Sequence, residues 1–234
     1  MPINAKNILI FGASGAIGNA FVKLFKNIYP NANIYPFSQN SREFPVDYNN
    51  EDSIAKAAEI ASHKGKIDIV LVATGILHTD TIKPEKSLND ISADNLAHIF
   101  QANSITPALI AKHCLPKLNK QQSSIFAVLS ARVGSISDNR LGGWYAYRAS
   151  KAALNMVIKT AAIETVRTNK QAIVVGLHPG TVDSDLSQPF QKNVPQGKLF
   201  TAEYSVEKLW QVVNTLTAQD SGKCFAWDGA EVLP

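Results

Sequence analysis

The stretch ILIFGASGAIGNAF, residues 8–21, carries the strongest fold signal in the sequence. An apolar run typical of a buried strand leads through Gly12, Gly15 and Gly18 into a segment with helical periodicity. Glycines in such a turn let the backbone approach a pyrophosphate, and the following helix N-terminus offers free N–H groups to that anion. A glycine-rich turn that serves packing only is the alternative, but its place between a strand and a helix favours a dinucleotide-binding turn.

The rest of the chain alternates short apolar runs with segments of helical period. Strands that are apolar on both faces and separated by helices indicate a parallel sheet with helices on each side. We therefore predict one α/β domain over residues 1–234, with a doubly wound parallel sheet of about seven strands. The runs that predict strands are 6–11, 33–37, 67–74, 124–130, 171–177 and 222–227; the predicted helices are 16–28, 51–63, 92–114 with a kink at Pro107, 146–169 and 205–217.

One stretch, residues 178–204, is too long for an ordinary connection between a strand and a helix. Loops of this length are usually functional, so we expect it to contact the substrate and the cofactor. Within it, residues 193–200 (NVPQGKLF) are expected to close over the cofactor as a lid.

Composition excludes several classes of protein. Hydrophobic residues make up 45% of the 234 residues and charged residues 18%, which is typical of a globular protein with an ample core. The net charge is +4, but the basic residues are scattered, so we expect no nucleic-acid partner. Cys114 and Cys224 have no metal-ligand spacing, and we expect no metal. Because no signal-peptide layout and no membrane-length apolar run is present, we expect a cytoplasmic protein without membrane contact.

The segment GGWYAYRASKAALN, residues 142–155, predicts an acid–base pair. Tyr147 precedes Lys151 by four residues, which on a helix places both side chains on one face, one turn apart. Tyr145 is six residues from the lysine, and we expect it to line a pocket instead. A free phenol has a pKa of about 10, and a neighbouring ammonium group would favour the phenolate.

In this order, the glycine turn, Asn103 and the Tyr147–Lys151 pair resemble the short-chain dehydrogenase/reductase superfamily over nearly the whole chain. GSISDN (134–139) followed by GGWYAYRASKAALN is similar to the branch with C-factor-type and sniffer-type carbonyl reductases. The resemblance implies a single-domain Rossmann fold that uses NAD(P)(H) and forms a homodimer or homotetramer. It also implies that the helices 92–114 and 146–169 are the surfaces that pair.

The resemblance assigns roles to particular residues. Tyr147 would protonate a carbonyl oxygen or deprotonate an alcohol, and Lys151 would support it and hold the nicotinamide ribose. Asn103 would hold a water in a proton relay to the lysine. The turn after residues 171–177, Pro179–Gly180–Thr181, would contact the nicotinamide amide.

The end of the second predicted strand, YPFSQNSREF (35–44), bears on the choice of cofactor. An acidic residue there would accept from a ribose 2′-hydroxyl, but the sequence has Ser38 and, further on, Arg42. A hydroxyl and a guanidinium suit a 2′-phosphate, so we predict NADP (NADPH), with NAD as the alternative. Asp47 either accepts from the adenine amino group or caps the turn.

Two departures from the family pattern affect the cofactor site. Ala16 stands where the common glycine turn has glycine, and VATGIL replaces the usual asparagine-rich turn, with Thr74 expected to supply the lost hydrogen bonding. The predicted cofactor-binding residues are Gly12, Ser14, Gly15, Ala16, Ile17, Gly18, Ser38, Arg42, Asp47, Ala73, Thr74, Gly75, Tyr147, Lys151, Pro179, Gly180 and Thr181.

A third departure concerns the catalytic serine. Alignment from FAVLSARVGS places Ala131 where that serine is expected, whereas counting back from Tyr147 gives Ser135. Ser130 is a second candidate, although strand alternation would point it to the opposite face. The predicted catalytic set is Tyr147, Lys151, Asn103 and Ser135.

The sequence therefore predicts an oxidoreductase that transfers hydride between nicotinamide and a carbonyl or alcohol. The alternative is a nucleotide-binding signalling protein with weak catalysis, which Ala131 favours; nucleic-acid binding has only the net charge in its support. An apolar aldehyde or ketone is the expected substrate, because the residues predicted to line the pocket are apolar or aromatic. They are Val182, Leu186, Phe190, Trp144, Tyr145, Ile76 and Leu77.

Overall fold

The computed structural model describes residues 3–234, so Met1 and Pro2 of the predicted domain lie outside the described part. Its centre is a parallel sheet of six strands in the order β2-β1-β3-β4-β5-β8. All six apolar runs identified in the sequence form strands of this sheet. The strands are β1 (Asn7–Phe11), β2 (Asn33–Phe37), β3 (Ile69–Val72), β4 (Ser124–Leu129), β5 (Ala172–His178) and β8 (Cys224–Ala226).

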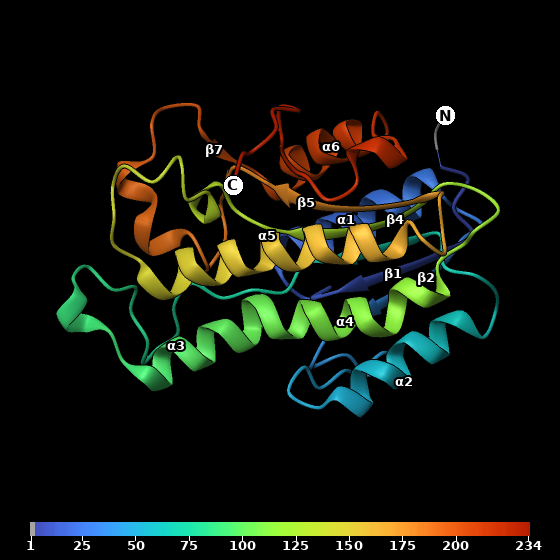
Figure 1. Cartoon of the computed structure of the whole chain (residues 1–234), viewed down its shortest axis with the longest axis horizontal. Coiled ribbons are helices and arrows are strands. Elements are labelled where there is room, and N and C mark those ends of the chain that lie inside the picture. Colours follow the sequence, from blue (N-terminus) through green and yellow to red (C-terminus); the bar gives the residue numbers. More distant parts are fainter. Residues whose placement is uncertain (1–2) are drawn as a thin grey trace.

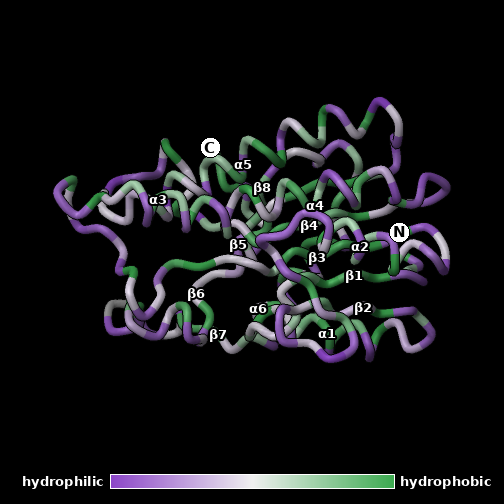
Figure 2. The backbone as a smooth tube through the Cα atoms, turned by 90° about the horizontal axis from the view of Figure 1, so that it is seen from below, coloured by the Kyte–Doolittle hydropathy of each residue, from purple (hydrophilic) through white to green (hydrophobic). Residues whose placement is uncertain are grey.

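Helices cover both faces of the sheet, as the apolar runs predicted (Figure 1). Helices α2 (Glu51–Ser62), α4 (Thr106–Cys114) and α5 (Tyr145–Thr165) pack on the face formed by Phe11, Val70 and Val128. The helices α1 (Ala16–Ile28) and α6 (Ala202–Val213) pack on the other face, formed by Ile10, Leu71 and Ala127. Alternate side chains of one strand thus fill two separate cores. In Figure 2 the central strands are mostly hydrophobic, and hydrophilic residues concentrate in the outer loops.

The sheet has six strands rather than about seven. Beyond β2, the chain makes only an isolated parallel bridge between Ser38 and Pro45. Residues 39–44 between them are too few for the helical crossover that a further parallel strand requires. The edge is consequently open at β2, which explains how Pro36 fits into that strand: an edge strand tolerates a missing N–H.

The segment predicted as one helix over 92–114 is interrupted in the turn just before Pro107. Helix α3 (Ala93–Phe100) passes into a π-helical turn, Gln101–Ile105, before α4 begins. Pro107 follows directly in the first turn of α4, and because the backbone before it is also helical, its missing N–H leaves a carbonyl of the preceding turn without a helical donor. The interruption therefore surrounds Asn103, and π turns of this kind are frequent at functional sites.

The long segment 178–204 has structure of its own. Its short strands β6 (Thr181–Val182) and β7 (Leu199–Phe200) pair in parallel, and a 3-10 helix spans Gln188–Asn193 between them. Helix α6 follows at once and begins three residues earlier than predicted, because the Thr201 hydroxyl caps it by accepting from the Tyr204 N–H. Within residues 3–234, none of the helices is both long and apolar enough to cross a membrane.

Candidate active site

A cavity of about 580 Å³ opens at the carboxyl ends of β1, β3, β4 and β5. Ligands of open parallel α/β sheets bind at this edge, where the strand order reverses. Twelve of the predicted catalytic and cofactor-binding residues line the cavity although they come from distant parts of the chain. They are Ser14, Gly15, Ala16, Ile17, Ala73, Thr74, Gly75, Tyr147, Lys151, Pro179, Gly180 and Thr181.

The glycine turn brings helix α1 into close contact with β1. A Cβ on Gly18 would lie 2.1 Å from the Gly12 carbonyl oxygen, so only glycine permits this approach. Gly15 is the N-cap residue of α1 and has no side chain to cap it. The first N–H groups of α1 are thus left without a side-chain acceptor at the wall of the cavity, as an anion site requires.

Tyr48 supports this turn, and the sequence analysis missed it. Its hydroxyl accepts from the Gly12 N–H at 2.7 Å and donates to the Phe37 carbonyl oxygen at 3.3 Å. Burial raises the pKa of Tyr48 to about 12, so the hydroxyl stays protonated and able to donate. The side chain joins the glycine turn to the end of β2; no local pattern in PVDYNN signals this role.

The residues predicted to determine the preference for NADP over NAD follow the carboxyl end of β2. The Phe37 carbonyl oxygen accepts from the N–H groups of both Gly12 and Ala13, which fixes the start of the next turn beside the glycine turn. Ser38 is buried and Arg42 is exposed on that turn; neither lines the cavity. The Asp47 carboxylate accepts from the Asn49 N–H at 2.9 Å, which is the turn-capping alternative.

Lys151 lines the cavity, and Asn103 lies near it on the other side of Gly75. The Lys151 ammonium donates to the Leu129 carbonyl oxygen at 2.8 Å, and burial lowers its pKa to about 8. The Asn103 amide exchanges two hydrogen bonds of 2.8 Å with the backbone of Ile76. A Cβ on Gly75 would lie 3.1 Å from Asn103 Oδ1 and 3.4 Å from Lys151 Nζ, so the two polar groups share a space kept open by glycine.

Tyr147 lies one turn before Lys151 on α5, with the lysine nitrogen 5.9 Å from the centre of its ring. Burial raises the pKa of Tyr147 to about 12. The sequence predicted the opposite direction, because it weighed the nearby ammonium and not the loss of solvent. At neutral pH the phenol is consequently protonated and can donate a proton.

The three candidate positions for the catalytic serine lie differently relative to the cavity. Ala131 lines the cavity, as alignment from the strand predicted. The Ser135 hydroxyl does not line it: it lies 3.3 Å from the Ser137 hydroxyl and accepts from the Asp138 N–H. Ser130 reaches the cavity wall, but its hydroxyl donates to Asn155 Oδ1 at 2.6 Å. Both hydroxyls are therefore engaged away from the place where the serine is expected.

His178, the last residue of β5, is a further cavity residue. Its Nδ1 is buried without a hydrogen-bond partner among the described residues. Burial, with a smaller effect of Arg132, lowers its pKa to about 4, so the ring is neutral. Thr74 Oγ1 is likewise buried and unpaired within residues 3–234. Unsatisfied buried polar atoms at a cavity indicate a place for ligand groups or water.

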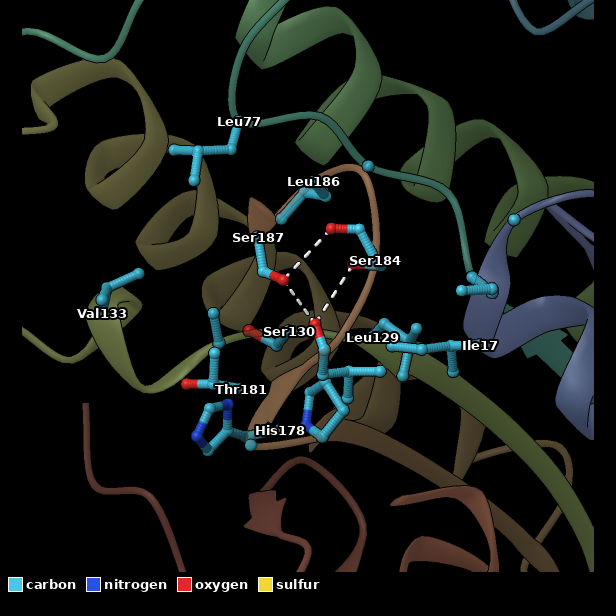
Figure 3. Close-up of a pocket in the computed structure, with 18 of the residues that line it drawn as sticks. Ile17, Leu77, Leu129, Ser130, Val133, His178, Thr181, Ser184, Leu186 and Ser187 are labelled. Carbon is cyan, nitrogen blue, oxygen red and sulfur yellow. Dashed lines mark hydrogen bonds between the residues drawn. The ribbon is translucent and has the colours of Figure 1, made fainter. Parts of the chain in front are cut away.

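The outer wall of the cavity is largely apolar. In Figure 3, Leu77 and Leu186 lie on one side of the cavity, Val133 on another, and Ile17 beside Leu129. The hydroxyl of Ser187 donates to the Val182 and Ser184 carbonyl oxygens and so ties the turn that carries Leu186.

Two of the predicted wall residues lie elsewhere. Tyr145 is not among the cavity residues. Its neighbour Trp144 is one of them, and the centre of its ring lies 5.0 Å from that of Phe190. Ile76 packs against a separate small core with Ile82 and Ile99. The other predicted wall residues, Val182, Leu186, Phe190, Trp144 and Leu77, do line the cavity. In the described part of the chain, no three His, Cys, Asp or Glu side chains cluster as a metal site.

The chain is similar to several known proteins. A family model described as enoyl-(acyl carrier protein) reductase matches residues 24–216. The C-signal protein of Myxococcus xanthus is 33% identical over 146 residues, which cover 62% of this chain and 82% of that protein. A 1-hydroxy-2-glutathionyl-2-methyl-3-butene dehydrogenase of Rhodococcus sp. (strain AD45) is 29% identical over 185 residues, covering 79% of this chain and 76% of that one.

Solved structures share the fold. The NADPH-bound carbonyl reductase from chicken fatty liver superimposes with a TM-score of 0.84 at 22% identity, over 98% of this chain and 99% of that chain. The carbonyl reductase Sniffer of D. melanogaster gives 0.83 at 23% identity, over 98% and 100%. At these identities the likeness establishes the α/β architecture.

Proposed function

The chain belongs to the short-chain dehydrogenase/reductase family and is an oxidoreductase of that family, and we propose that it is an NADPH-dependent reductase of apolar aldehydes or ketones. One observation carries the proposal: Tyr147 and Lys151 line the same cavity as the glycine turn and the uncapped start of α1. An acid–base pair and an anion site in one apolar cavity suit transfer of a hydride and a proton to a carbonyl.

The residues around the cavity fit a dinucleotide. The close approach of Gly18 to Gly12 leaves the N-terminus of α1 open to a pyrophosphate. Thr74 Oγ1, buried and unpaired in the described structure, offers a partner near the carboxyl end of β3. We assign Ser14–Gly18 to the pyrophosphate, Ala73–Gly75 to the adjoining sugar, Lys151 to the nicotinamide ribose, and Pro179–Thr181 to the nicotinamide amide.

The chain's own residues account for the proton. The cofactor, when bound, supplies the hydride that reaches the carbonyl carbon. Tyr147 donates its phenolic proton to the carbonyl oxygen, which completes the alcohol and leaves a phenolate. Lys151, whose pKa of about 8 keeps it largely charged at pH 7, stabilises that phenolate. Asn103 holds the relay that returns a proton to it.

The substrate class rests on the cavity wall. Leu77, Val133, Leu186 and Phe190 line the same cavity as Tyr147, and they offer contact area rather than hydrogen bonds. The dehydrogenase and carbonyl reductases among the similar proteins support a carbonyl or alcohol as the reacting group. We also propose a cytoplasmic location, since the two buried cysteines in the described chain are free thiols.

The cofactor preference is tested by nicotinamide fluorescence. We expect NADPH to bind more tightly than NADH, because the Arg42 guanidinium pairs with the 2′-phosphate. Arg42→Ala should therefore weaken NADPH binding about tenfold and leave NADH binding unchanged. Glu43→Gln, a neighbour on the same exposed turn, is the control. Equal losses for both nucleotides would contradict the role of Arg42, and no binding of either would refute the proposed function.

The reaction is tested by NADPH oxidation with a panel of apolar aldehydes and ketones. We expect Tyr147→Phe to lower kcat at least about 1,000-fold while NADPH still binds, because the proton donor is lost and the ring is kept. Tyr145→Phe, which removes a hydroxyl two residues away and outside the cavity, should keep wild-type turnover. If Tyr147→Phe retained turnover, another acid would have to supply the proton.

A weakly catalytic nucleotide-binding signalling protein remains the second candidate. Ala131 at the serine's place and the similarity to the C-signal protein favour it. Steady NADPH oxidation by the wild-type protein that Tyr147→Phe abolishes would exclude it. Tight NADPH binding without turnover across the carbonyl panel would support it.

A further inference from the structure

Glu85 is a buried carboxylate outside the family motifs. Its side chain is only 4% exposed, and it lies in the loop between β3 and α3. A carboxyl group this deeply buried needs hydrogen-bond partners, because removing it from water is costly. Its partners lie at the start of α5, and Figure 1 shows that this loop and the N-terminus of α5 occupy the same end of the molecule.

The backbone before α5 has an unusual conformation. Gly142, Gly143 and Trp144 are consecutive residues with φ values of 62°, 63° and 53°. Glycine adopts this left-handed region freely, but for tryptophan it is an outlier that the surroundings must hold in place. The Trp144 N–H donates to the Glu85 carbonyl oxygen at 2.5 Å, which supplies one such restraint.

Glu85 also caps the helix. Trp144 is the N-cap residue of α5, and its indole makes no capping bond. The Glu85 carboxylate accepts from the Ala146 N–H at 3.2 Å instead, so an acceptor from a distant loop fills the position usually held by a local Ser, Thr or Asp. A negative charge is also favourable at this end of a helix.

A second side chain holds the turn from the helix side. Arg148 donates through Nε to the Gly142 and Gly143 carbonyl oxygens at 3.2 and 3.0 Å. The turn is thereby fixed between Glu85 and Arg148. It determines where two cavity residues lie: the Trp144 ring, 6.2 Å from the ring of Tyr147, and Tyr147 itself in the first turn of α5.

We propose that the Glu85 side chain is a positioning group of the active site: its carboxyl group caps the first turn of α5, next to the turn that the Glu85 backbone carbonyl holds at Trp144, and so places Trp144 and Tyr147 in the cavity. The inference rests on the proposed function for its catalytic consequence. A misplacement of about 1 Å in a reacting group is enough to cost about 100-fold in rate.

The experiment compares Glu85→Ala, Glu85→Gln and the control Glu207→Gln, an exposed carboxylate on α6. The first readout is kcat for an apolar aldehyde, per NADPH site titrated by fluorescence. Glu85→Ala should lose about 10- to 100-fold in kcat per site at an unchanged NADPH affinity. Glu85→Gln keeps an amide oxygen that accepts from Ala146, so it should stay within about threefold of wild type.

The second readout is amide hydrogen exchange, which does not depend on turnover. Glu85→Ala should exchange about tenfold faster in the peptide 142–150, with the α6 peptide unchanged. Wild-type exchange in 142–150, faster exchange throughout the chain, or wild-type kcat per site in Glu85→Ala would each overturn the proposal. If the wild type reduced no carbonyl while the local exchange effect appeared, the proposed function would fail and the anchoring by Glu85 would stand.

Discussion

Tyr147 and Lys151 show at the residue scale how burial and charge compete. Loss of solvent raises the pKa of the phenol to about 12 and lowers that of the ammonium to about 8, so each group is pushed toward its neutral form. The two shifts leave the tyrosine protonated and the lysine largely charged near pH 7. That combination provides both the proton and the positive charge that carbonyl reduction requires.

Ala131 leads to a prediction at the same scale. It lines the cavity at the place expected for the hydroxyl that polarises the substrate oxygen. Ala131→Ser should raise kcat for a good carbonyl substrate at least about tenfold, since one such donor is typically worth 100-fold or more. Steady-state kinetics at saturating NADPH provide the measurement.

Ser135→Ala is the control for that prediction, because the Ser135 hydroxyl is bonded outside the cavity. It should leave kcat unchanged. A large loss of kcat in Ser135→Ala, together with no gain in Ala131→Ser, would instead make Ser135 the working donor and restore the sequence-based preference.

The glycine turn is the element whose role can be tested most directly. Gly18→Ala would place a Cβ 2.1 Å from the Gly12 carbonyl oxygen, so α1 would have to move away from β1. NADPH binding should fall at least about 100-fold, because the pyrophosphate contacts move with the helix. Fluorescence titration measures the loss, and circular dichroism reports whether the fold survives.

Gly15→Ala is the matched control. Its added Cβ would lie 3.5 Å from the same oxygen, an ordinary contact, and Gly15 has a φ of −72° that alanine adopts easily. Because Gly15 also lines the proposed pyrophosphate site, Gly15→Ala should keep α1 in place and lose less NADPH affinity than Gly18→Ala. Equal losses in Gly15→Ala and Gly18→Ala would show that the turn tolerates no side chain for reasons other than this contact.

The π turn of residues 101–105 is a second element with a functional consequence. It lets Asn103 bond with both the N–H and the carbonyl oxygen of Ile76, while Gly75 leaves room for Lys151 beside it. The apolar period of 92–114 is helical throughout, and Pro107 is the sign in the sequence that the winding changes. The bonds of Asn103 with Ile76, at the end of β3, are a contact that only the tertiary structure reveals.

The molecule as a whole leaves apolar side chains exposed on α5. Met156 and Ile163 are 66% and 51% exposed, and their spacing of seven residues places them on one face of the helix. The family resemblance made this helix a pairing surface, and we expect a homodimer or homotetramer of the 25.4 kDa chain. Met156→Glu/Ile163→Glu should convert it to a monomer in light scattering after size exclusion.

Ile60→Glu is the control for the pairing surface, since Ile60 is 44% exposed on α2 and lies outside the predicted interface. Its oligomeric state should equal that of the wild type. A wild-type protein that is already monomeric would contradict the prediction, as would an oligomer that survives both charges on α5.

Local periodicity and short distances along the chain were enough to predict the α/β class, the six apolar strands, the glycine turn and the Tyr147–Lys151 spacing. The other features depend on contacts between distant segments. Tyr48 reaches Gly12, and Glu85 reaches Ala146, across long stretches of chain that no local pattern connects. The tertiary structure also sets the direction of the Tyr147 pKa shift, because desolvation depends on which side chains surround the phenol. The spacing of four residues in the sequence reveals only that the charged Lys151 is near.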